Sequence, residues 1–144
     1  MVSKTFAIDA ATGLIKRAMG SAALTADAYI GTQHDQGAAV ITDMLCRVVI
    51  EACDVASGNE TYHLRIVGSN VSDRSDGTVL AERLLGDAGS IAIETVDTAA
   101  GDVVDIRFRT ERGNTAYRYI DLHLDVTGTS PSITFGAYIT KEIC

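Results

Sequence analysis

The sequence lacks tryptophan and contains only one proline, three cysteines and three histidines among its 144 residues. It also lacks long apolar runs: stretches such as residues 48–50 fall far short of the ~20 residues that cross a bilayer, so we expect no membrane span. Lys and Arg number 12 against 19 Asp and Glu, and the resulting net charge of -7 argues against nucleic acid as a partner. With 47% hydrophobic and 22% charged residues, the composition is typical of a folded globular domain.

The N-terminus does not have the pattern of a secretory signal, which needs a basic start and then ~7–15 continuous apolar residues. Asp9 interrupts the first apolar residues, and Lys16 and Arg17 occupy positions where a secretory signal requires apolar residues. Cys46 and Cys53 would lie ~23 Å apart along an extended strand, which is too far for a disulfide. We therefore predict a protein made in a cytoplasm, with reduced cysteines that serve as small apolar fillers.

Alternating hydrophobicity dominates the chain after residue 40. Apolar and polar residues alternate with the period of two that is typical of half-buried strands in residues 44–52, 62–66, 104–109, 119–126 and 133–140. Two more strands are predicted over residues 28–32 and 90–96, and residues 79–85 fit either a strand or a helical turn. Glycine-containing polar turns separate the segments. The pattern predicts an all-β fold, a jelly-roll-like antiparallel β-sandwich, as one domain over residues 24–144.

Residues 1–23 differ from the rest because they are rich in alanine and lack strand alternation. Apolar residues at helix-like spacing lie between Gly13 and Gly20, but the six residues between these glycines are too few for a stable isolated helix. We predict an extended N-terminal arm that becomes ordered against a neighbouring subunit.

Residues that could hold a metal are few. Some jelly rolls are cupin-like metalloenzymes, in which several histidines and a glutamate converge on one metal ion. His34, His63 and His123 are far apart in this sequence, although His63 and His123 could be neighbours on an outer sheet face. The acidic loop 73–77 lacks the alternation of an EF-hand calcium loop. We predict no bound metal and interpret this loop as a solvated turn.

Catalytic motifs are equally sparse. The sequence contains no Gly-x-Ser-x-Gly elbow, no P-loop and no dinucleotide fingerprint. Asp121 and Asp125 lie four apart on one strand, ~13 Å along it, which exceeds the spacing of a glycosidase carboxylate pair. We interpret them as part of a solvated or interface-facing sheet surface. We therefore predict that the protein is not an enzyme, with no catalytic residues and no cofactor.

Tyrosine and arginine side chains are predicted on the outer faces of several strands. Both residue types are enriched at protein interfaces, because they bury a large area and keep a polar group. The predicted interface residues are Tyr119, Tyr138, Arg107, Arg109 and Arg118. The outward positions of the last strand (Thr134, Gly136, Tyr138 and Thr140) are uncharged, which favours contact with another chain.

From about Ala39 to its end, the sequence resembles tailed-phage capsid cement (decoration) proteins of the Bordetella-phage type. The similarity lies in residues 37–41, 64–69, 75–80, 117–126 and 133–139, with a Gly-Thr turn at 128–129 before the last strand. The resemblance implies a jelly roll that trimerises, binds the outside of the icosahedral shell and clamps neighbouring major capsid proteins, with no catalytic residues.

The partners expected from this resemblance are the major capsid protein and two further copies of the chain in a homotrimer, with no nucleic acid and no membrane. The expected location is the outer surface of the virion capsid. Two alternatives remain open. A phage tail or receptor-binding module would use the same fold, but the absence of tryptophan argues against an aromatic sugar groove. A cupin-like metalloenzyme would contain a bound metal.

Overall fold

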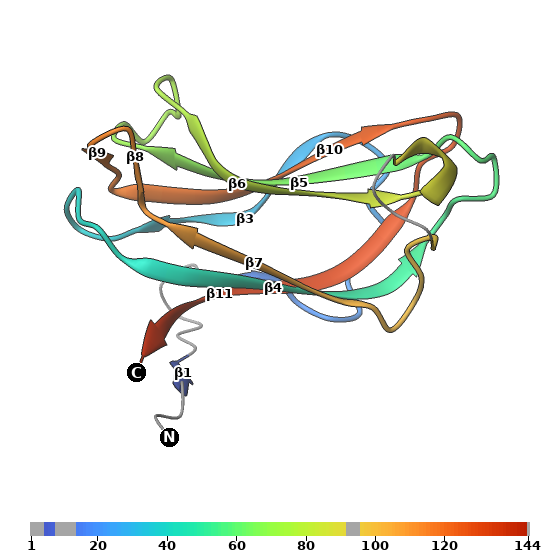
Figure 1. The fold of residues 1–144 in the computed structure, drawn as a ribbon, viewed down its shortest axis with the longest axis horizontal. Helices are drawn as coiled ribbons and strands as arrows, with labels where there is room; N and C mark the ends of the chain where they lie inside the picture. The colour runs from blue at the N-terminus through green and yellow to red at the C-terminus, as the bar shows by residue number, and fades with distance from the viewer. Residues whose placement is uncertain (1–4, 8–13, 92–95, 144) are drawn as a thin grey trace.

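A computed structural model describes residues 5–7, 14–91 and 96–143 and consists almost entirely of β-strands (Figure 1). The main strands are β2 (Ile15–Arg17), β3 (Ala28–Asp35), β4 (Asp43–Cys53), β5 (Thr61–Ser69), β6 (Thr78–Gly86), β7 (Val103–Arg109), β10 (Tyr119–Thr127) and β11 (Ile133–Ile143). Shorter elements are β1 (Thr5–Ala7), the hairpin strands β8 (Glu111–Arg112) and β9 (Thr115–Ala116), and a 3-10 turn η2 (Ala88–Ser90).

The strands form two antiparallel sheets that face each other (Figure 1). In sheet A, β1 and β2 both pair with β11, and the order continues through β4 to β7. In sheet B the order is β3-β10-β5-β6. If the eight main strands are lettered B to I in chain order, the sheets read BIDG and CHEF, which is the strand order of a jelly roll. The all-β sandwich predicted from the sequence is confirmed.

The core lies between the sheets and follows from the alternation. Met44, Cys46, Val48 and Ile50 of β4 point inward and are buried, as are the apolar residues of β5, β7, β10 and β11. Each large apolar side chain buried in this way contributes about 1.5–3 kcal/mol. Tyr62 is also fully buried, and its hydroxyl donates to the carbonyl of Asp54 at 2.6 Å, so that its polar end is satisfied.

The five segments with clear alternation are strands β4, β5, β7, β10 and β11, as predicted. Residues 28–32 begin the longer strand β3, and residues 79–85 belong to strand β6. The strand predicted over residues 90–96 starts instead in the 3-10 turn η2, and residues 92–95 lie outside the described residues.

Part of the predicted N-terminal arm belongs to the sandwich. Leu14 is in the core, and its carbonyl accepts a hydrogen bond from the amide of Ile139 at 2.7 Å. The next strand, β2, pairs with β11 in sheet A. Lys16 is 3% exposed, and its ammonium donates to the carbonyls of Thr32 at 2.6 Å and Ile120 at 3.3 Å in sheet B. The prediction that the arm needs a neighbouring subunit for its order is therefore wrong for residues 14–17; residues 1–4 and 8–13 lie outside the described part.

The first two cysteines have the predicted state. Cys46 and Cys53 are free, and burial raises the pKa of the Cys46 thiol to about 12. Cys46 fills a core position and stays protonated at neutral pH, as expected for an apolar filler. Cys144 lies outside the described residues. None of the described helical segments is long and apolar enough to cross a membrane.

Candidate interaction surface

The outer face of sheet A carries exposed and half-buried apolar side chains, which we call the apolar row: Ile15, Met19, Val49, Val103 and Tyr138. Ile15 is 41% exposed, and Met19 and Val103 are each 56% exposed. The register brings the row together, because Ile15 lies opposite Tyr138, and Val49 lies opposite Val103 on the next strand. The row therefore crosses from β2 over β11 and β4 to the edge strand β7.

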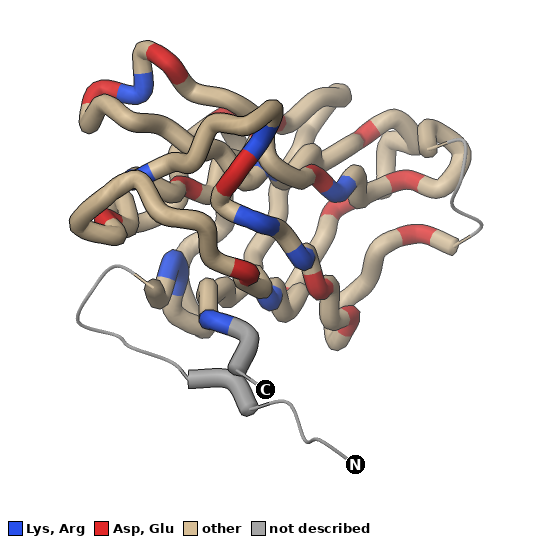
Figure 2. Tube along the Cα trace, turned by 60° about the vertical axis from the view of Figure 1, so that its left-hand side comes forward, with Lys and Arg blue, Asp and Glu red and all other residues tan. Residues whose placement is uncertain are grey.

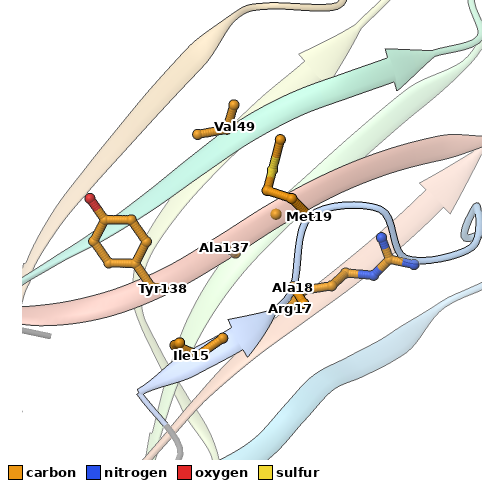
Figure 3. A pocket seen from close by; sticks show the side chains of 8 residues that line it. Ile15, Arg17, Ala18, Met19, Val49, Ala137 and Tyr138 are labelled. Carbon is orange, nitrogen blue, oxygen red and sulfur yellow. The ribbon is translucent and has the colours of Figure 1, made fainter. Parts of the chain in front are cut away.

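Residues 18–21 bring part of the row onto the sheet. The amide of Gly20 donates to the Glu51 carboxylate on β4, at 2.9 Å to Oε1, which holds this loop over β11. Met19 then lies directly on Gly136, where any Cβ would collide with the methionine side chain. A half-open apolar cavity of about 240 Å³ remains between Met19, Ile15, Val49 and Tyr138 (Figure 3). A partner side chain could enter it without displacing polar groups.

Paired charges on β4 and β7 lie beside the apolar row. Arg47 donates two hydrogen bonds to Asp105, at 2.7 and 2.8 Å, and Arg109 donates to Asp43 at 2.9 Å. These arginines lower the pKa values of the Asp105 and Asp43 carboxyls. Along the part of the chain that the structure describes, acidic and basic positions are interspersed instead of forming blocks of one sign (Figure 2). The face therefore offers an apolar centre with a polar rim, which is the usual organisation of a protein interface.

The structure divides the five predicted interface residues between two surfaces. Tyr138, Arg107 and Arg109 lie on sheet A, beside or within the apolar row. Arg118 and Tyr119 lie instead at the start of β10 in sheet B, where the guanidinium is 5.0 Å from the tyrosine ring centre. Arg118 also donates to Asp35 at 2.7 Å, which lowers the pKa of that carboxyl to about 2.

The outer face of β11 is less open than the sequence predicts. Gly136 lies under Met19 of the same chain, and Thr140 is fully buried. Only part of this face, around Tyr138 and Thr134, remains for another chain. The sequence predicts the alternation of β11 correctly but contains no signal that residues 18–21 fold back over it.

On the outer face of sheet B, Asp121 is buried within the chain, whereas the sequence predicts a solvated or interface-facing position. Its side chain is 1% exposed, because Arg74 from the β5–β6 loop covers it and donates two hydrogen bonds, at 2.9 and 3.0 Å. Gln33 donates a third at 2.8 Å. The Arg74 guanidinium also lies 4.2 Å from the ring centre of Tyr29. This cluster fixes the β5–β6 loop to the sheet, so loop 73–77 is more than a solvated turn.

His63 and His123, on the outer face of sheet B, have separate structural partners. His63 contacts the carboxylate of Glu82 at 3.0 Å, whereas the ring of His123 lies edge-on to Tyr29 at 4.7 Å. The register places His63 opposite Asp125 and His123 opposite Arg65, so the two rings are diagonal neighbours as predicted. Across residues 5–7, 14–91 and 96–143, no three His, Cys, Asp or Glu side chains are grouped as metal ligands.

Comparisons with known proteins give little further information. No family model and no curated protein matches the chain. A solved structure of the CBM22-1 and GH10 modules of Clostridium thermocellum endo-1,4-beta-D-xylanase 10B, complexed with xylohexaose, is 17% identical, with a TM-score of 0.37. The match covers 95% of this chain and 24% of that one, so the chain spans about a quarter of its length. A likeness this distant identifies neither a ligand nor an activity for the present chain.

Proposed function

We propose that the chain is a structural virion protein that decorates the outside of a tailed-phage capsid and strengthens contacts between major capsid proteins. The observation that carries the proposal is the apolar row on sheet A, with its half-open cavity and its rim of Arg–Asp pairs. Exposed methionine and aliphatic side chains beside a half-buried tyrosine on a sheet are suited to binding another protein surface. The choice of partner rests on the resemblance of residues 39–144 to capsid cement proteins, which we infer from the sequence alone.

The physical demands of this role agree with the fold. A decoration protein needs a rigid domain with an outer contact surface, and a jelly roll supplies both without a catalytic site. Many copies bind one closed shell, so that each contact can be modest while the assembly gains stability through multivalency. A net charge of -7 suits a component that faces solvent and not packaged DNA.

The direct test uses capsid shells of the phage that encodes the protein, from which the bound copies of the protein have been removed. The purified protein is added to these shells and co-sedimented with them. We expect saturable binding at a fixed ratio to the major capsid protein. Met19→Asp places a charge in the apolar row and should weaken binding at least tenfold. The matched control Val96→Asp changes an exposed residue outside the row and should bind normally. Absence of binding by the wild-type chain, or equal binding by both variants, would refute the proposal.

We further propose that the chain forms a homotrimer in which Tyr119 and Tyr138 are anchors on different contact surfaces. Tyr138 belongs to the apolar row, so the trimer contact takes its end of the row and the capsid contact takes the part around Met19 and Val49. A ring of three uses two unlike patches on each subunit, so their location on sheets B and A is compatible with one heterologous interface. Light scattering should give three times the chain mass of 15.2 kDa. Tyr119→Ala with Tyr138→Ala should shift the folded protein towards monomer, whereas a wild-type monomer at high concentration would disprove the trimer.

A further inference from the structure

We propose that the free edge of β7 pairs with β7 of a second copy, as two antiparallel strands related by a twofold axis centred on Ile106. β7 ends sheet A, and on its outer side no strand pairs with it among the described residues. A seven-residue edge strand presents unpaired backbone groups that another strand can bind. The sequence of β7 makes a second copy of the same strand the best-matched occupant.

The direction of the backbone groups is the first argument. Asp102 accepts from the amide of Ile50 at 2.8 Å, and Thr110 donates to the carbonyl of Thr42 at 3.0 Å, so the even-numbered residues around β7 face β4. Successive residues in a strand direct their N–H and C=O groups to alternate sides. The odd-numbered residues, from Val103 to Arg109, therefore direct theirs to the open edge.

Charge selects the register. Twofold pairing centred on Ile106 places Asp105 opposite the second copy's Arg107, and the symmetry repeats this pair. Opposite charges at facing positions stabilise a strand pair, and like charges destabilise it. A shift by two residues in one direction would place Asp105 opposite itself, and in the other direction Arg107 opposite itself. Only the Ile106-centred register pairs opposite charges without facing like ones.

The same register also places compatible side chains opposite each other on both faces of the sheet. On the inner side, Val104 of one copy lies opposite Phe108 of the other, so that apolar residues continue across the junction. On the outer side, Val103 lies opposite Arg109, whose aliphatic stem can cover the exposed end of the apolar row. Asp105 keeps its bond to Arg47, because a carboxylate accepts more than two hydrogen bonds.

This contact is independent of the proposed capsid binding, because it needs only two copies of the free chain. If the chain also forms trimers, a twofold edge contact would join neighbouring trimers. The two contacts share only Val103, which ends the apolar row and faces Arg109 of the second copy. The rest of the row lies on β2, β4, β11 and residues 18–21, so both kinds of contact can form at once.

Disulfide trapping tests the register. Val103 and Arg109 face each other only between copies, at the ~5.5 Å Cα separation of a hydrogen-bonded antiparallel pair, which a disulfide can span. The double variant Val103→Cys with Arg109→Cys, with Cys53 and Cys144 replaced by Ser, should give mostly covalent dimer under mild oxidation. A variant with only one of these two cysteines should give at least fivefold less covalent dimer. Val96→Cys with Arg112→Cys, two exposed positions off β7, is the matched control pair.

Charge reversal then tests the electrostatic argument. Adding Arg107→Asp to the double-cysteine variant sets two aspartates opposite each other and should lower dimer yield at least fivefold, whereas Arg107→Lys should preserve it. Far-UV circular dichroism verifies that each variant keeps its β-sheet spectrum. The proposal is wrong if the double-cysteine protein stays monomeric on reducing-agent-free gels, or if one cysteine alone or the control pair crosslinks equally well. Each of these results is independent of shell binding.

Discussion

The buried ammonium of Lys16 should make the stability of the protein depend on pH in the alkaline range. Lys16 extends from β2 in sheet A to carbonyls of β3 and β10 in sheet B, and it is the only lysine in the described core. Burial lowers its pKa from 10.5 to about 8, and the nearby Asp121 carboxylate opposes this effect only in part. The folded protein therefore holds the charged form at a cost at neutral pH.

The sign and size of this pH effect on the unfolding free energy follow from proton linkage. Between pH 8 and 10.5 the unfolded chain retains a proton on Lys16 that the folded chain has lost, so raising the pH favours the folded state. One pKa unit corresponds to about 1.4 kcal/mol, and the whole window therefore corresponds to about 3 kcal/mol. The cost is fully present below pH 8 and disappears above 10.5. From pH 7 to 9 the gain is about 1 kcal/mol.

Urea unfolding monitored by far-UV circular dichroism measures this effect, since the chain has no tryptophan. The informative quantity is the difference in unfolding free energy between wild type and Lys16→Met. Contributions of groups other than Lys16, such as the thiols, largely cancel in this difference. It should change by about 1 kcal/mol in favour of wild type from pH 7 to 9. The control Lys141→Met removes an exposed lysine and should leave the pH dependence unchanged. A pH-independent difference for Lys16→Met would refute the reasoning.

Three further predictions concern stability. Gly31→Ala should cost more than about 2 kcal/mol in urea unfolding, because Gly31 has a φ of 71° and its added Cβ would collide with the Lys16 carbonyl; an unchanged midpoint would contradict this. Asp121→Asn should cost about 3 kcal/mol in the same assay by leaving Arg74 without its carboxylate; a cost below about 1 kcal/mol would show a weak pair. On acidification, the Asp35–Arg118 pair should contribute stability above pH 3.8 and lose it as the pH falls towards 2. Arg118→Gln should weaken that acid dependence, and an identical acid titration would exclude the pair as its source.

The strands were predictable because burial of one sheet face imposes a period of two on the sequence. Residues 44–52 and 119–126 alternate clearly, and both are central strands of the sandwich. Which strands share a sheet was not predictable from alternation, since it depends on long-range pairing. For this reason Tyr119 and Tyr138 appear equivalent in the sequence but lie in different sheets.

The burial of two charged residues could not be predicted from the local sequence either. A polar residue at an outward strand position is predicted to face solvent, but Asp121 is covered by an arginine 47 positions earlier in the chain. Lys16 follows a short alanine-rich stretch without strand signals, and its carbonyl partners are supplied by β3 and β10. In both cases the cover comes from a segment distant in sequence.

The placement of charges limits how copies of this domain can associate. On β7, the positions of Asp105 and Arg107 disfavour the two registers next to the Ile106-centred one, so the same residues that limit unspecific edge pairing define a specific contact. The apolar row has no such selectivity of its own, because aliphatic side chains accept any apolar partner. A protein that binds at a fixed position therefore needs the Arg47–Asp105 and Arg109–Asp43 pairs beside the row. Reversing these rim charges should alter partner choice and on-rate more than the stability of the isolated domain.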